Sequence, residues 1–234
     1  GQGMLIGVFD GGFQNMSQIG ALQPLITSNR ILAQKNYVTN GTNIENTESH
    51  GTRVLSILAA DQPNVYVGAA PAASYILCVT EASGEYRVEE YNWLFAAEMA
   101  DSTGVDIINT SLGYSIFDNA TMSYTYSDMD GQTAVITKAS NIAATKGIAL
   151  INSAGNEGSK VWRFITAPSD SENVLSVGAV DASGFRADFS SFGPSADNRI
   201  KPDVSALGQG TAVITASGNI AFQNGTSFSG PVLA

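Results

Sequence analysis

Residues 4–12 read Met-Leu-Ile-Gly-Val-Phe-Asp-Gly-Gly, and this stretch decides the fold. Its first six residues are continuous in apolar character, which is typical of a β-strand that is buried on both faces. Strands of that kind belong to parallel sheets that are covered by helices on both sides. The run stops at Asp10, so a carboxylate follows the strand directly.

Further apolar runs predict more buried strands, at residues 75–79, 105–108, 148–151 and 174–180. Helical patterns lie at residues 52–60, 88–100 and 133–146, and Gly147 suits the end of the last one. Strands that alternate with helices imply parallel pairing. We therefore predict an α/β fold of three layers, with a mostly parallel sheet flanked by helices. Residues 212–216 and 220–222 predict an added β-hairpin, and no linker marks a second domain.

Bulk composition excludes several functional classes. The net charge of the 234 residues is −10, so no basic stripe is available to neutralise the phosphates of a nucleic acid. No run of about 18 apolar residues occurs, so we predict no membrane span. Cys78 is the single cysteine, which makes an intrachain disulfide impossible.

Three of the predicted strands end in polar segments that contain glycine. Asp10 ends the first strand, and residues 109–113 and 152–158 follow two others. In open parallel sheets the carboxyl ends of the strands form the binding crevice. We therefore expect these segments to meet at one edge of the sheet.

The last residues, from Asn224 to Pro231, place Ser227 where a loop enters a helix. We expect Pro231 in the first turn of that helix, where a missing N–H is no loss. The only histidine, His50, lies at the start of another predicted helix. A lone histidine is more often structural, and a Ser/Gly-rich turn is common. Together, however, Asp10, His50 and Ser227 supply the carboxylate, imidazole and hydroxyl that acyl-bond hydrolysis needs.

These residues resemble the subtilisin-like serine proteases, or subtilases, across nearly the whole chain. Their order Asp, His, Ser is that of subtilisins, whereas in α/β-hydrolase esterases the Ser comes before the Asp and the His. The motifs that carry the resemblance are Asp10-Gly11-Gly12, Ser49-His50-Gly51-Thr52, residues 153–158 (Ser-Ala-Gly-Asn-Glu-Gly) and Gly225-Thr226-Ser227 with Pro231. Residues 189–194 (Phe-Ser-Ser-Phe-Gly-Pro) and 201–206 (Lys-Pro-Asp-Val-Ser-Ala) also match.

The resemblance implies a role for each matching residue. Ser227 would be the nucleophile, His50 the general base and then acid, and Asp10 its orienting partner. Asn156 would stabilise the oxyanion together with the backbone N–H of Ser227. The walls of the substrate cleft would be Ser111, Leu112 and Gly113 on one side, where substrate adds as a strand, and Ser153, Ala154 and Gly155 on the other.

The resemblance also implies a function, a serine endopeptidase that acts on protein or peptide substrates through an acyl-enzyme. It is compatible with an N-terminal propeptide as a partner, and it implies export from the cell. The chemistry requires no cofactor. Structural calcium is compatible with the family but is left unassigned, because no loop has calcium-type ligand spacing. The acidic residues considered are Glu45, Glu48, Asp118, Asp128 and Asp130, for which an acidic solvated face is the favoured interpretation.

One alternative stays open. Residues 1–234 would form a single peptidase domain that is truncated at its C-terminal end, because subtilases continue well beyond the residue that matches Ala234. A short final helix holds Ser227 less firmly. The triad could then be present but unassembled, in a non-catalytic binding or scaffold domain or an inert proteolytic fragment.

Overall fold

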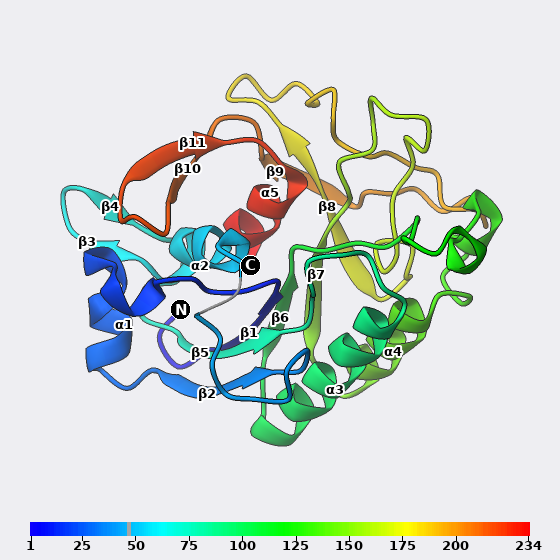
Figure 1. Cartoon of the computed structure of the whole chain (residues 1–234). Helices are drawn as coiled ribbons and strands as arrows, with labels where there is room; N and C mark the ends of the chain where they lie inside the picture. The colour runs from blue at the N-terminus through cyan, green and yellow to red at the C-terminus, as the bar shows by residue number, and fades with distance from the viewer. Residues whose placement is uncertain (46–47) are drawn as a thin grey trace.

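The computed structural model describes residues 1–45 and 48–234, and within them seven strands form one parallel sheet (Figure 1). Their order is β2-β5-β1-β6-β7-β8-β9. The strands are β1 (Leu5–Asp10), β2 (Ile31–Asn36), β5 (Ser74–Val79), β6 (Ile107–Thr110), β7 (Ala149–Ser153), β8 (Val174–Val180) and β9 (Val204–Leu207). After β1 the chain builds one side of the sheet, and from β6 onward it builds the other. The crevice between the carboxyl ends of β1 and β6 is therefore the place where ligands bind in such sheets.

The predicted buried strands are all present. In the register of β1, Gly7 lies between Ile76 of β5 and Ile108 of β6. The predicted hairpin forms from β10 (Thr211–Ile214) and β11 (Ile220–Gln223), which pair in antiparallel fashion. A second antiparallel pair joins β3 (Asp61–Gln62) and β4 (Tyr66–Val67).

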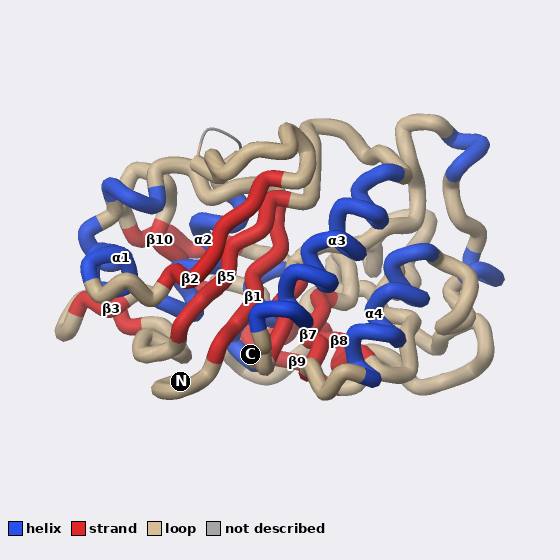
Figure 2. The backbone as a smooth tube through the Cα atoms, turned by 90° about the horizontal axis from the view of Figure 1, so that it is seen from below, coloured by secondary structure: helices blue, strands red, loops and turns tan. Residues whose placement is uncertain are grey.

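Helices cover both faces of the sheet, which confirms the three-layer prediction. Figure 1 shows α2 and α5 on one side and α3 and α4 on the other, and Figure 2 shows α3 and α4 side by side. Each side has its own cluster of buried apolar residues. The α-helices are α1 (Gln23–Thr27), α2 (His50–Ala59), α3 (Val88–Thr103), α4 (Val135–Thr145) and α5 (Thr226–Leu233). Short 3₁₀ helices are η1 (Met16–Gln18), η2 (Gly20–Leu22), η3 (Ala120–Met122) and η4 (Tyr126–Asp128).

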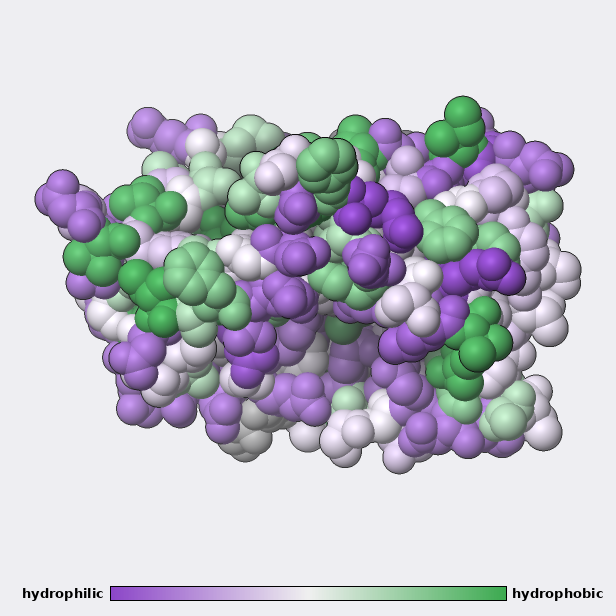
Figure 3. All heavy atoms as spheres, turned by 90° about the horizontal axis from the view of Figure 1, so that it is seen from above, coloured by the Kyte–Doolittle hydropathy of each residue, from purple (hydrophilic) through white to green (hydrophobic). Residues whose placement is uncertain are grey.

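The buried face of α3 differs from the apolar pattern that predicts the helix. Val88, Tyr91 and Phe95 are exposed. The face toward the sheet carries Trp93, three alanines and the carboxylates of Glu89 and Glu90. Elsewhere on the surface, Figure 3 shows hydrophobic residues in separate groups between hydrophilic ones on the face drawn there.

The position of Pro231 corrects a prediction. Helix α5 already begins at Thr226, so Pro231 lies inside the helix instead of in its first turn. A proline there removes the N–H that would bond to the carbonyl four residues earlier, which is that of Ser227. The Ser227 carbonyl instead accepts a hydrogen bond of 2.8 Å from Ser111 Oγ. The proline thus frees a carbonyl by which the sheet edge holds the helix.

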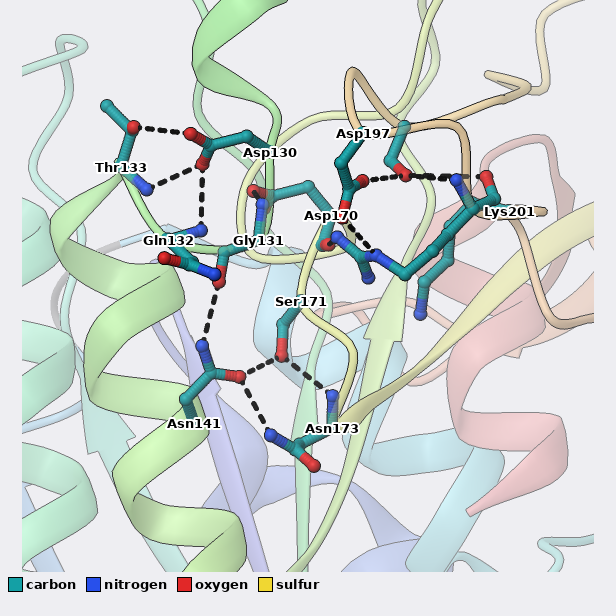
Figure 4. A network of polar contacts seen from close by, with 12 residues as sticks. Asp130, Gly131, Gln132, Thr133, Asn141, Asp170, Ser171, Asn173, Asp197 and Lys201 are labelled. Atoms are coloured by element: carbon teal, nitrogen blue, oxygen red, sulfur yellow. Dashed lines mark hydrogen bonds and ion pairs between the residues drawn. The ribbon is translucent and has the colours of Figure 1, made fainter.

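A polar network connects three segments of the chain, residues 130–133, 170–173 and 197–201 (Figure 4). Asp130 caps its own turn through Gln132 and Thr133. The Arg199 guanidinium lies over Gly131, forms a 2.6 Å ion pair with Asp197, and donates to the Asp170 carbonyl at 2.6 Å. Arg199 therefore joins three segments that are distant in the sequence.

We expect Arg199→Met to destabilise the fold by about 2 kcal/mol, because it removes one charge-assisted hydrogen bond to a partly buried carbonyl. Urea unfolding followed by circular dichroism measures the change. Lys138→Met on α4, whose side chain is exposed and unpaired within the described residues, should change the free energy of unfolding by less than about 0.5 kcal/mol. Equal effects of the two substitutions would contradict a bridging role for Arg199.

Candidate active site

The first feature of the site is a pair formed between Asp10 and His50. Asp10 is the last residue of β1 and is fully buried. His50 is the first residue of α2, and its Nδ1 lies 2.8 Å from Asp10 Oδ1. A carboxylate only accepts hydrogen bonds, so Nδ1 donates and Nε2 keeps its lone pair. Asp10 Oδ1 also accepts from the N–H of Gly11, which fixes the carboxylate that orients the ring.

Ser227 lies beside this pair, in the first turn of α5 and 8% exposed. The ring of its neighbour Phe228 is 5.7 Å from the His50 ring, between centroids. The Ser227 hydroxyl donates to the Ser111 carbonyl at 3.2 Å. Within the described residues it has no hydrogen bond to His50. The hydroxyl has one proton, so it must leave the Ser111 carbonyl before it can donate to Nε2.

Asn156 is held in one orientation by Thr226. Its Oδ1 accepts from the backbone N–H of Thr226 at 2.9 Å and from the Thr226 hydroxyl at 3.0 Å. Its Nδ2 therefore points elsewhere and has no partner in the part of the chain that the structure describes. The N–H of Ser227 belongs to the first turn of α5, where N–H groups lack intrahelical partners. Two hydrogen-bond donors thus stand next to the Ser227 hydroxyl.

Two hollows flank these residues and share one wall, Ser111 to Gly113. The first, of about 460 Å³, contains Asp10 and His50. The second, of about 350 Å³, contains Ser227 and, on its other wall, Ser153, Gly155 and Asn156. The structure thus brings the predicted residues together at one edge of the sheet, except that Ala154 is fully buried and lines neither hollow.

Gly113 supplies a free backbone edge between the hollows. Its N–H and carbonyl have no partner among residues 1–45 and 48–234, whereas the next residue, Tyr114, pairs with Ala167 in both directions. An extended peptide could hydrogen-bond to this edge as an added strand.

Comparison with known proteins identifies the family. The model of the subtilase family matches residues 1–234. The chain belongs to the subtilase family. Subtilisin NAT of Bacillus subtilis subsp. natto is 32% identical over 203 residues, covering 85% of this chain and 47% of that protein. This subtilase therefore spans about half the length of the curated relatives it matches.

Solved structures show the same fold at low sequence identity. A cold adapted subtilisin-like serine proteinase has a TM-score of 0.75 and 19% identity, over 99% of this chain and 72% of that one. The Patellamide maturation protease PatA has a TM-score of 0.74 and 21% identity, over 99% of this chain and 75% of that one.

Electrostatics within this subtilase raise the pKa of His50 above its ordinary value of 6.5. Burial alone would lower that pKa, since it disfavours the imidazolium. The charge and hydrogen bond of Asp10, assisted by Glu48, outweigh burial and the opposing charge of Arg53.

Carboxyl groups crowd the first hollow, and among residues 1–45 and 48–234 no lysine or arginine lines it. Burial, and then the charge of Glu89, raise the pKa of Glu81 to about 8. Burial raises the pKa of Glu89 to about 7. Burial, and then the charges of Asp118 and Glu157, raise the pKa of Glu85. These carboxyl groups therefore hold their protons more tightly than isolated ones do.

The motifs include Ser111 and Thr226 but do not predict what their side chains hold, and they do not include Thr166. The Ser111 side chain, which accepts from Asn109 at 3.3 Å, holds the carbonyl of Ser227. Thr226 orients Asn156. Thr166 lines the second hollow, and its buried Oγ1 has no partner in the described chain. A Cβ on Gly113 would clash with that oxygen, so glycine is required there. The Ser and Thr contacts join residues far apart in sequence, which no local pattern reveals.

The five acidic residues considered for calcium do not all lie together, because only Glu48 and Asp118 line the first hollow. No group of three or more His, Cys, Asp or Glu side chains that could hold a metal ion occurs within residues 1–45 and 48–234. Three of the candidate carboxylates accept local hydrogen bonds instead: Glu45 from Ser17, Asp128 from Thr125, and Asp130 from Thr133. The candidates therefore do not fit one shared calcium site. Among the same residues, none of the helices has the length and apolar character needed to cross a membrane.

Proposed function

We propose that this subtilase is a serine endopeptidase that hydrolyses peptide bonds of protein substrates. The observation that carries the proposal is the pairing of His50 with buried Asp10, in a hollow that shares the wall Ser111 to Gly113 with the hollow of Ser227. The pairing leaves Nε2 as a proton acceptor, and the ring that carries it lies 5.7 Å from that of Phe228, the neighbour of Ser227. The first turn of a helix also favours negative charge at Ser227.

In the acylation step, Ser227 Oγ forms a bond to the substrate carbonyl carbon while its proton passes to His50 Nε2. The negative charge develops on the carbonyl oxygen. Asn156 Nδ2 and the N–H of Ser227 donate to that oxygen. The C–N bond then breaks, and His50 returns the proton to the departing amine. Asp10 holds the imidazolium throughout.

Deacylation repeats these transfers with water. A water molecule gives a proton to His50 and bonds to the acyl carbon, and the same two donors hold the second oxyanion. The bond to Ser227 Oγ breaks, and the serine regains its proton from His50. The products are a carboxylic acid and the free site, so the steps use only groups of the chain, and we propose no cofactor for them.

A non-catalytic domain is the second candidate, and the hydrogen bond of the Ser227 hydroxyl to Ser111 favours it. A peptidyl diphenyl phosphonate separates the two. It reacts when Oγ attacks phosphorus and a phenoxide leaves. We expect one adduct per chain on Ser227, located by tandem mass spectrometry, and none in Ser227→Ala. Absence of labelling in the folded full chain would overturn the peptidase proposal.

Acidification should inactivate the enzyme at a higher pH than the ordinary histidine pKa suggests. Only neutral His50 accepts the serine proton, and its pKa is raised. The midpoint of kcat/KM against pH should therefore lie above 6.5. Glu48 favours the imidazolium, so Glu48→Gln should move the midpoint downward and raise the fraction of activity kept at low pH.

Glu45→Gln is the matched control for this measurement, because the Glu45 carboxylate bonds to Ser17 instead of facing His50. Its midpoint should equal that of the parent. A midpoint that Glu48→Gln leaves in place, or moves upward, would show that Glu48 does not act on the base.

Removal of the Asn156 amide should lower kcat with little effect on KM. For Asn156→Ala we expect a fall on the order of 10²–10³, a size known for the oxyanion asparagine of a subtilisin. Steady-state kinetics on a soluble peptide measures it. Asn219→Ala, at the exposed tip of the β10–β11 hairpin, should keep kcat. A change mainly in KM would show that Asn156 binds the substrate in its ground state instead of stabilising the oxyanion.

We also propose a protein or peptide as the substrate, an N-terminal propeptide as a further partner, and export from the cell. The free edge at Gly113 supports extended polypeptide as the substrate form. The propeptide and export rest on membership of the subtilase family. Protease sensitivity of the chain in spheroplasts and in intact cells tests export.

A further inference from the structure

The first hollow is strongly acidic, beyond what the proposed chemistry needs. Its lining includes four carboxylates besides Asp10, those of Glu48, Glu81, Glu85 and Asp118. They come from three separate segments that meet around one space. Asp118 joins the others because its N–H donates to the Glu85 carbonyl at 3.0 Å.

These carboxylates lack cationic partners. Among residues 1–45 and 48–234, no lysine or arginine forms an ion pair with any of the four, and none lines the hollow. Two oxygens are also left over. Asp10 Oδ2 is fully buried without a hydrogen-bond partner in the described chain. Glu81 uses only Oε1, which accepts from Tyr114 and Thr80.

The raised pKa values agree with this geometry. Like charges contribute to the shift at Glu81, through Glu89, and at Glu85, through Asp118 and Glu157. A cation that enters among these groups favours their ionised forms, and its attraction then offsets their mutual repulsion. Within residues 1–45 and 48–234, His50 is the only basic side chain that lines the hollow, and it is paired with Asp10. A cationic ligand would therefore meet the other carboxyl groups without competition from a lysine or arginine of the hollow.

Peptide geometry shows which part of a substrate enters the hollow. Side chains of an extended strand alternate between its two faces. When a peptide lies along Gly113 with its scissile carbonyl at Ser227, the residue before the scissile bond lies next to the second hollow, which Ser227 lines. The second and fourth residues before that bond then point to the other side, where the first hollow opens next to His50.

We propose that the first hollow selects substrates with lysine or arginine at the second and fourth residues before the scissile bond. The inference rests on the proposed peptidase activity and names its substrate class. The long stems of these side chains reach the carboxylates while their charged ends stay partly hydrated.

The test compares internally quenched peptides that differ only at those two positions, with lysine in one and norleucine in the other. Norleucine keeps the apolar stem and lacks the charge. In the full chain we expect kcat/KM to favour the lysine peptide about tenfold or more at low salt, since each exposed ion pair adds a few-fold. The preference should shrink toward one as salt rises to about 1 M.

Substitutions of the acidic residues show whether the first hollow causes the lysine preference. Glu85 and Asp118 are exposed, so Glu85→Gln with Asp118→Asn should fold and should cut the preference about fourfold or more. Glu98→Gln, exposed on α3 beside a different hollow, should keep the parent preference. A lysine-to-norleucine ratio near one in the parent at low salt would overturn the proposal.

The peptidase proposal has its own outcome in the same experiment. If the norleucine peptide is cleaved and Ser227→Ala abolishes the cleavage, the enzyme is a peptidase whatever the ratio. If neither peptide is cleaved and the phosphonate does not label Ser227, the peptidase proposal fails and the preference fails with it.

Discussion

Ser227→Ala should lower kcat on a peptide substrate by a factor on the order of 10⁶, the size known for the serine of a subtilisin triad. The hydroxyl is the only group in the proposed mechanism that bonds to the acyl carbon. KM should change little, because the hollows and the free edge at Gly113 stay in place. The residual rate then reflects water attacking a carbonyl that Asn156 still polarises.

Ser229→Ala, in the same helix, is the control for an effect of the substitution on folding. Ser229 is fully buried and donates to the Thr226 carbonyl at 2.8 Å. Ser229→Ala should lose about 1 kcal/mol of stability and keep kcat within a few-fold. If Ser227→Ala retains more than about 1% of kcat, above what water attack alone allows, Ser227 is not the nucleophile. If Ser229→Ala loses as much activity as Ser227→Ala, the loss reports on the helix instead of the hydroxyl.

The fold could be predicted where burial alone determines which residue types a segment contains. Strands in the middle of the sheet, such as β1 and β8, are almost continuously apolar, and their bounds follow from that. The two edge strands were not predictable in the same way. In β2, partly buried and exposed side chains alternate and include Gln34 and Lys35. Strand β9 is short and largely open to solvent. The helix α3 was predictable, but its buried face depends on hydrogen-bonded carboxylates, which a hydropathy pattern counts as surface residues.

The site, too, could be predicted in part: the topology predicts where its residues lie, but not the contacts of their side chains. Topology alone places Asp10 and residues 111–113 at one edge, because parallel strands end together. The state of each side chain depends on contacts across the chain. Asn156 is oriented by a residue 70 positions away, and the Ser227 hydroxyl meets a carbonyl 116 positions away. The acidity of the first hollow likewise comes from loops that meet only in three dimensions.

Asp10→Asn should lower kcat by a factor on the order of 10⁴ while the chain stays folded, as such a substitution does in another Asp-His-Ser triad. The carboxylate accepts from His50 Nδ1 and so keeps the lone pair on Nε2. An asparagine can present its NH₂ to the ring instead, which favours the tautomer that carries hydrogen on Nε2. The base would then face Ser227 with a donor. The loss of charge also removes the largest cause that raises the pKa of His50, so the remaining activity should have a lower pH midpoint.

Asp106→Asn controls for loss of an aspartate at the other end of the same strand pair, where Asp106 Oδ2 accepts from the N–H of Leu5 at 2.8 Å. It should affect stability by about 1 kcal/mol and leave both kcat and the pH midpoint unchanged. The ring tautomer is read directly from ¹⁵N shifts of His50, the only histidine in the chain. If Asp10→Asn keeps hydrogen on Nδ1 and still loses activity, orientation of the tautomer is not what Asp10 contributes. Stabilisation of the imidazolium by its negative charge would then be the cause, because that charge is the property which asparagine lacks in either tautomer.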